Sequence, residues 1–164
     1  MNIAQDAEAL LIEITAPGAD VVGFEHAPQS SAEHKALDQA IERLEQADQL
    51  ITINPDAGCH IESSHVQQTK HHHDDEEDGH DHANHHDDHD ATAHVDHDEH
   101  EHAEHNAFTI EYHFECKHAD ALQQLSTQWF THFPNTHGIH VNIFTDRRQS
   151  SAQLAPTNTQ VALQ

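Results

Sequence analysis

Alternating and periodic apolar positions mark out strands and helices at both ends of the chain. The clearest pattern runs from Phe108 to Cys116, where every second residue is apolar. It predicts a strand with one face on a core and the other in water. Apolar runs that end at turn residues predict further strands at 10–15, 50–53, 59–66, 139–143 and 161–163. Helical spacing of apolar residues predicts helices at 33–49, after the start signal Ser30-Ser31, and at 120–133.

The middle of the chain, residues 67–106, is low in complexity and nearly free of apolar residues. It separates two apolar regions, 1–66 and 107–164, and neither has enough apolar residues for a core of its own. We therefore predict one α+β domain over 1–164, a sandwich of a largely antiparallel sheet with two helices. The segment 67–106 would be a long loop between two strands, disordered without a ligand because it cannot bury a core.

The charge balance restricts the partners of the protein. The chain has 164 residues with 22 His, 30 Asp and Glu, and only 6 Lys and Arg, for a formal net charge of −24. Nucleic acids and anionic membrane surfaces are excluded because both require clustered Lys and Arg. No apolar run is long enough to insert into a membrane. Cationic partners are favoured, and metal ions are the smallest of these.

The loop holds most of the histidines. Between residues 71 and 105 there are no Lys or Arg, and the histidines stand among carboxylates. Imidazole binds zinc, copper and nickel, and pairs such as His-x-His or His at i, i+4 point the same way. With three or four ligands per ion, the loop could hold roughly three zinc ions. The predicted ligands are His71, His72, His73, His80, His82, His85, His86, His89, His94, His97, His100, His102 and His105.

Zinc is the expected metal, and Cu2+ or Ni2+ would also bind such a loop in vitro. The alternative interpretation is an acidic spacer, because charge runs usually indicate only solubility. A spacer needs no histidine, however, whereas the part from 71 to 105 is more than a third histidine. Each dication would also relieve repulsion among the carboxylates. Since protonated imidazole cannot bind metal, we expect affinity to fall steeply below pH ~6.5.

The two cysteines, Cys59 and Cys116, lack the CxxC spacing of a zinc knuckle. They are either buried thiols in a cytosolic protein or one disulfide in an oxidising compartment. A disulfide would clamp the two strands beside the loop, which favours that interpretation. Antiparallel pairing around the bond would place Ile61 opposite Phe114 and Ser63 opposite Tyr112 on the inner face.

The same register predicts a possible ordered metal site on the wet face of these strands. It places His60 opposite Glu115 and Glu62 opposite His113. The alternative is two cross-strand pairs that only stabilise the sheet. Three further histidines are weaker candidate ligands, His26 beside Glu25 and the His-x-x-His pair His137 and His140. The chain has no GxSxG, HExxH or phosphate-loop motif, so we do not expect an enzyme.

Several segments together resemble the ZrgA family of periplasmic zinc-uptake accessory proteins. The resemblance extends over nearly the whole chain. It rests on Asn2-Ile3-Ala4 with Leu10 to Glu13, Val22 to Pro28, Cys59, the His/Asp loop, Tyr112 to Cys116, Phe130 to Pro134 and Leu154 to Leu163. It implies a periplasmic protein that binds zinc through the loop and supports a zinc ABC importer, with that importer's substrate-binding protein as a partner. It also supports a Cys59–Cys116 disulfide.

The start of the chain departs from the family pattern. Met1 to Asp6 lacks the basic start and apolar stretch of a signal peptide, whereas family members normally carry one, with His-containing residues after it. We expect a signal that has been removed. Two rival functions stay open: a cytosolic nickel or copper storage or delivery protein, and an acidic interaction protein with no role in metal binding.

Overall fold

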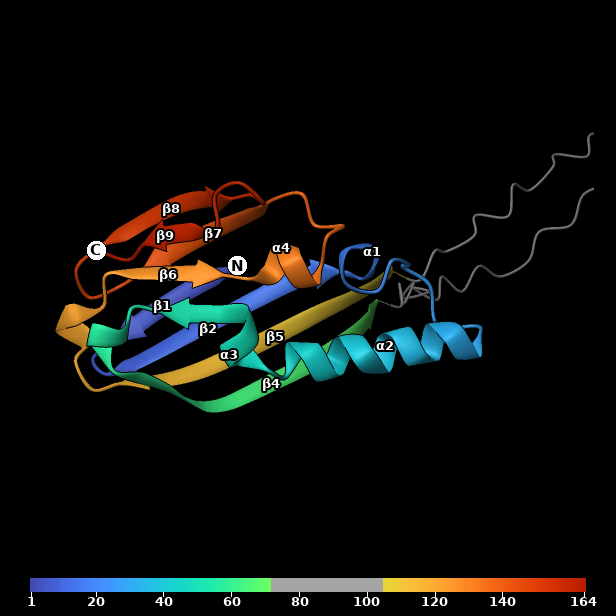
Figure 1. Cartoon of the computed structure of the whole chain (residues 1–164), viewed down its shortest axis with the longest axis horizontal. Coiled ribbons are helices and arrows are strands. Elements are labelled where there is room, and N and C mark those ends of the chain that lie inside the picture. Colours follow the sequence, from blue (N-terminus) through green and yellow to red (C-terminus); the bar gives the residue numbers. More distant parts are fainter. Residues whose placement is uncertain (72–104) are drawn as a thin grey trace, which may run out of the picture.

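The computed structural model describes residues 1–71 and 105–164. Helices are short except for one, and more of the described chain is strand than helix (Figure 1). The strands are β1 Asn2–Asp6, β2 Ala9–Pro17, β3 Ile51–Ile53, β4 Cys59–His71, β5 His105–Cys116, β6 Gln124–Thr127, β7 Ile139–Phe144, β8 Gln149–Leu154 and β9 Gln160–Ala162. The helices are α1 Gly18–Val21, α2 Ser31–Leu44, α3 Ala47–Leu50 and α4 Trp129–His132, with 3-10 turns η1 Pro55–Ala57 and η2 Ala119–Ala121.

The strands form two sheets. The larger has six strands in the order β4-β5-β2-β1-β7-β8, and the smaller has three in the order β3-β6-β9. Every pairing is antiparallel except that of β1 with β7, which is parallel. The prediction of a mixed α+β fold with a largely antiparallel sheet is confirmed.

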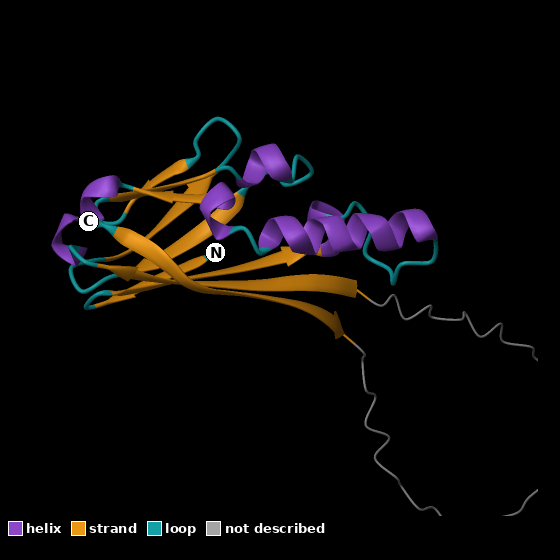
Figure 2. Cartoon of the chain, turned by 60° about the horizontal axis from the view of Figure 1, so that its bottom comes forward, coloured by secondary structure: helices purple, strands orange, loops and turns teal. Residues whose placement is uncertain are grey.

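One core lies between the two sheets. Buried residues of β2 and β5, such as Ile12 and Ile110, belong to the same apolar cluster as Leu125 of β6 and Val161 of β9. The smaller sheet and the helices cover one side of the larger sheet (Figure 2). Strands β2 and β5 bury alternate residues, so the opposite side of the larger sheet faces solvent.

Helix α2 begins at the predicted start signal. Ser30 is the N-cap, and its hydroxyl accepts a hydrogen bond from the Glu33 backbone N–H. The Glu33 carboxylate accepts in turn from the backbone N–H groups of Gln29 and Ser30, at 2.7 and 3.0 Å. This capping box satisfies donors that a helix start otherwise leaves unpaired. Leu44 then anchors the far end, because its carbonyl accepts a hydrogen bond from the buried Tyr112 hydroxyl of β5.

The predicted helix at 120–133 is wrong, and so is the prediction of two helices. Only Trp129–His132 is α-helical there, and Gln124–Thr127 is instead the central strand of the smaller sheet. The Asn54 side-chain carbonyl accepts from the backbone N–H groups of residues 123 and 124, at 2.9 and 3.2 Å. Because these two N–H groups donate to Asn54, they are not available for the hydrogen bonds of a helix. The apolar positions still point inward, because Leu125 and Trp129 are buried.

Besides β6, two further strands were not predicted. β1 is short, and β8 has the polar sequence Gln149-Ser-Ser-Ala-Gln-Leu154 at one edge of the larger sheet. β4 and β5 also extend into the segment 67–106, as far as His71 and His105.

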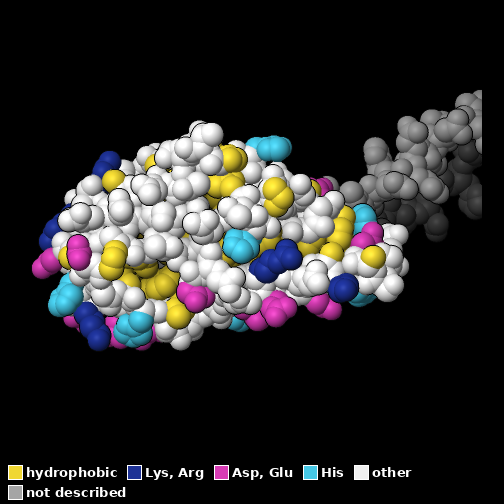
Figure 3. Space-filling view, viewed as in Figure 1, with side chains coloured by type: hydrophobic (Ala, Val, Ile, Leu, Met, Phe, Trp, Pro, Cys, Tyr) yellow, Lys and Arg dark blue, Asp and Glu magenta, His cyan; other side chains and the backbone are white. Residues whose placement is uncertain are grey.

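No helix in the described parts of the chain is long and apolar enough to cross a membrane. On the side covered by the smaller sheet and the helices, charged side chains of both signs are scattered among apolar ones (Figure 3).

Candidate functional site: the β4–β5 stem

Strands β4 and β5 form a two-stranded stem from which the histidine-rich segment leaves. They pair antiparallel from Cys59 opposite Cys116 at one end to His71 opposite His105 at the other. The predicted disulfide joins Cys59 to Cys116, with an S–S distance of 2.02 Å. It closes the end of the stem away from the histidine-rich segment. The stem therefore holds both ends of that segment side by side.

The predicted register is correct for the first residues of the stem and then fails. Ile61 pairs with Phe114 and His60 with Glu115, as expected. A β-bulge between Ile61 and Ser63 then shifts the pairing, so that Ser63 lies opposite His113. The predicted pairings of Ser63 with Tyr112 and of Glu62 with His113 are wrong, because Glu62 is the additional residue of the bulge.

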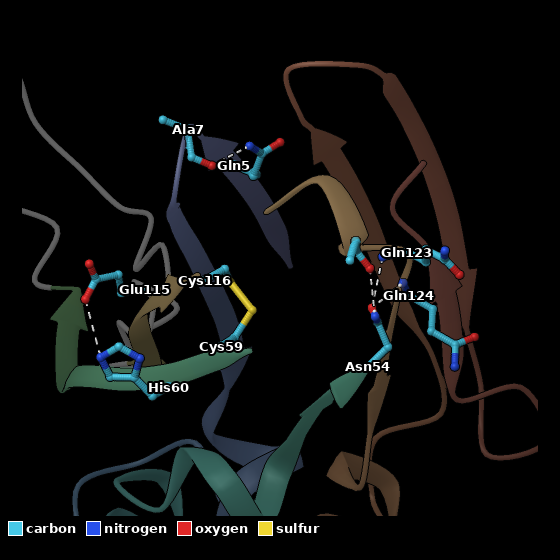
Figure 4. Close-up of a disulfide and its surroundings, with 10 residues drawn as sticks. Gln5, Ala7, Asn54, Cys59, His60, Glu115, Cys116, Gln123 and Gln124 are labelled. Atoms are coloured by element: carbon cyan, nitrogen blue, oxygen red, sulfur yellow. Dashed lines mark hydrogen bonds and ion pairs between the residues drawn. A yellow bond between two sulfur atoms is a disulfide. The ribbon is translucent and has the colours of Figure 1, made fainter. Parts of the chain in front are cut away.

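His60 and Glu115 form the best-defined pair on the exposed face of the stem. The His60 Nε2 lies 3.4 Å from a carboxylate oxygen of Glu115, and the two side chains point toward each other beside the disulfide (Figure 4). Both are about half exposed, at 52% and 47%. Two ligands of a tetrahedral zinc ion with bonds of 2.0–2.1 Å stand about 3.3 Å apart. The pair thus has the spacing of two zinc ligands.

The shifted register brings two residues to this face that the sequence analysis did not select. Glu111 pairs with His65 across the stem, and its carboxylate lies 3.9 Å from the Nε2 of His113 on its own strand. His65 and Glu111 were missed because the sequence indicates no bulge. The exposed face therefore carries His60, His65 and His113 with Glu111 and Glu115, which we call the stem cluster.

His26 lies apart from the stem cluster, in the segment between α1 and α2. Its ring stacks on Phe24 at 5.1 Å, its Nδ1 lies 2.9 Å from the Ala27 carbonyl, and its Nε2 lies 4.0 Å from Glu33. Asn106, at the start of β5, is buried and donates its side-chain N–H to the His26 carbonyl. His26 is thus held beside the base of the histidine-rich segment.

The Glu33 carboxylate lies 4.0 Å from the Nε2 of His26. Hydrogen bonds from the Gln29 and Ser30 backbone lower the pKa of Glu33, and the positive charge of His26 acts in the same direction. A carboxylate held in its ionised form attracts cations. His26 and Glu33 could therefore contribute to a cation site, although their separation of 4.0 Å is wider than that of the His60–Glu115 pair.

His137 and His140 do not join any of these groups. His137 is exposed before β7, and His140 lies on the exposed face of β7. Among residues 1–69 and 106–164, whose side chains the structure describes, no three His, Cys, Asp or Glu side chains stand close enough to hold a metal ion together. The described side chains therefore offer pairs of ligands, not a complete tetrahedral site.

Most of the predicted loop ligands lie outside the described residues. His71 and His105 are described as backbone partners at the end of the stem. The others, within 72–104, are not described: His72, His73, His80, His82, His85, His86, His89, His94, His97, His100 and His102. Their role as zinc ligands stays a prediction.

A disulfide-closed stem with His/Glu pairs, leading to a segment of histidines and carboxylates, has the donor set of a protein that binds transition metals. The profile of the ZrgA family zinc uptake proteins matches residues 1–163. The chain belongs to this family, as the sequence resemblance indicated. No curated protein sequence matches the chain significantly.

Proposed function

We propose that the protein captures or buffers zinc in the periplasm and supports a high-affinity zinc ABC importer. Its family supports a role in zinc uptake. The observation that carries the proposal further is the exposed His60–Glu115 pair, whose 3.4 Å separation suits two ligands of one zinc ion. The protein acts by reversible chelation and catalyses no reaction.

The histidines of residues 71–105 bind several zinc ions in exchange with one another. Many similar His and carboxylate ligands along one segment favour rapid uptake and release over one fixed geometry. The carboxylates, fourteen between residues 71 and 105, also raise the local concentration of dications. Cu2+ and Ni2+ compete for these ligands in vitro, because affinity for nitrogen ligands rises towards copper.

The stem is the structured base of this chelating segment. The disulfide supports an oxidising compartment such as the periplasm, where such bonds persist. It also keeps the stem paired while zinc binds to and leaves the segment above it. Zinc then passes to the substrate-binding protein of the importer, and the exposed pairs of the stem cluster are accessible for that transfer.

Uptake of radioactive zinc by cells tests this function. We expect cells that lack the gene to take up zinc more slowly at limiting zinc and normally at abundant zinc. A gene copy with His→Asn substitutions throughout 72–104 should not restore uptake, whereas a copy with His34→Ala, an exposed helical residue, should. Equal uptake with and without the gene at every zinc concentration would refute the role in import. Cell fractionation tests the periplasmic location. We expect the oxidised protein in the periplasmic fraction.

A further inference from the structure

The exposed face of the six-stranded sheet combines the stem cluster with an apolar hollow. The hollow has a volume of about 390 Å3 and includes Ala4, Ala9, Leu11 and Phe144 in its lining. Phe144 is 47% exposed, and among the described residues only Ile61 is another large apolar residue classed as exposed. Ala9 pairs with Glu115 and Leu11 with His113. The hollow therefore adjoins the stem cluster directly.

The His60–Glu115 pair is an incomplete zinc site. It supplies two ligands, and within the described residues no third His, Cys, Asp or Glu joins them. Stable protein zinc sites use three or four protein ligands. A zinc ion on this pair needs at least one ligand from elsewhere.

Whatever supplies the missing ligands should also cover the apolar hollow, because the hollow adjoins the same cluster. The segment 72–104 has only four Ala and one Val as apolar residues, so it has no large side chain to cover Phe144. It also leaves the stem at the end opposite to His60. A second copy of the chain supplies both a His/Glu pair and a matching apolar patch, because a two-fold interface places the same surface on both sides.

We propose that two copies of the protein associate face to face through this sheet and share a zinc ion, bound by His60 and Glu115 of each copy. The four ligands, two imidazoles and two carboxylates, complete a tetrahedral site. The hollows around Leu11 and Phe144 face each other beside it. This inference rests on the proposed zinc binding.

The dimer should depend on zinc. Six strands spaced by about 4.8 Å, with some six residues each at about 3.3 Å, present roughly 500 Å2 per copy. The total of about 1,000 Å2 is at the lower limit for a specific interface. Like charges also oppose contact, since each face carries Asp6, Glu13, Glu111 and Glu115, and no Lys or Arg stands among the strand residues of this face whose side chains are described. Zinc offsets this repulsion at Glu115, which is one of its ligands.

Sedimentation velocity of the full oxidised chain, with chelator and then with zinc, tests the proposal. We expect a monomer with chelator and a dimer with zinc. His60→Ala and Glu115→Gln should each raise the dimer dissociation constant more than about tenfold, equivalent to about 1.4 kcal/mol. His34→Ala, which also removes one exposed histidine, should leave it unchanged. Phe144→Asp keeps the ligands and should weaken the dimer in the same way.

Calorimetry on the same samples separates this proposal from the proposed function. A chain that binds zinc and stays monomeric would overturn the dimer and leave zinc binding intact. Zinc-dependent association that His60→Ala and Phe144→Asp do not weaken would also overturn it, because the loop histidines would then be the cause. A chain that binds no zinc would overturn both. Circular dichroism confirms that each variant is folded, as expected for exposed positions.

Discussion

Removal of the disulfide by Cys59→Ala with Cys116→Ala should destabilise the protein through its unfolded state. The two cysteines are 57 residues apart in sequence. In the loop-entropy model, closing a loop of this length stabilises the fold by about 4 kcal/mol. Cys116 is also buried, so its truncation adds a packing cost of about 1 kcal/mol. Urea unfolding of both proteins with a metal chelator present measures the difference in the free energy of unfolding, expected at about 5 kcal/mol.

Loop length provides an internal control for this explanation. Replacing residues 72–104 by a short Asn-Gly turn keeps both strands, which end at His71 and His105. It shortens the closed loop by more than half, so the stabilisation by the disulfide should fall by roughly 0.7 kcal/mol. A loss below about 1 kcal/mol for the double variant with the full loop would refute the entropic reasoning. So would a larger effect of the disulfide in the shortened chain.

Two substitutions test other parts of the fold. Glu33→Gln should lower the melting temperature at neutral pH. Because the pKa of Glu33 is below its ordinary value of 4.5, its stabilisation is complete above that value and is lost as the pH falls through the lowered folded-state pKa. The curves of melting temperature against pH for the unsubstituted protein and the Glu33→Gln variant should therefore meet at low pH. A constant difference between them would contradict this. Tyr112→Phe removes the buried hydrogen bond to the Leu44 carbonyl and should cost about 1–2 kcal/mol in urea unfolding. An unchanged stability would mean that the bond contributes nothing.

Strong local patterns predicted most of the fold. The alternation from Phe108 to Cys116 and the capping signal at Ser30 correspond to β5 and the start of α2. The failed helix at 120–133 shows the limit of such patterns. Its apolar residues are buried as expected, yet the backbone N–H groups of residues 123 and 124 donate tertiary hydrogen bonds to the Asn54 side chain, which favour a strand at Gln124. Those bonds join residues 69 and 70 positions apart in sequence, and local periodicity does not encode them.

The candidate site was predictable only next to the disulfide. His60 and Glu115 pair as expected because the cysteines fix the register beside them. Beyond Ile61 the bulge moves His113 away from Glu62 and places Glu111 opposite His65. A single additional residue exchanges the two faces of a strand. No Gly or Pro in β4 indicates where this residue lies, so His65 and Glu111 had to be found in the structure.

The central claim, that the protein binds zinc mainly through its histidine-rich segment, is tested most directly by calorimetric zinc titration of two oxidised proteins at neutral pH. One is the intact chain, and the other carries the Asn-Gly turn in place of residues 72–104, which hold eleven of the histidines. We predict several zinc ions, roughly three, on the intact chain and at most the zinc of the stem cluster on the shortened one. Equal stoichiometry in both proteins, or no zinc uptake by the intact chain, would contradict the claim.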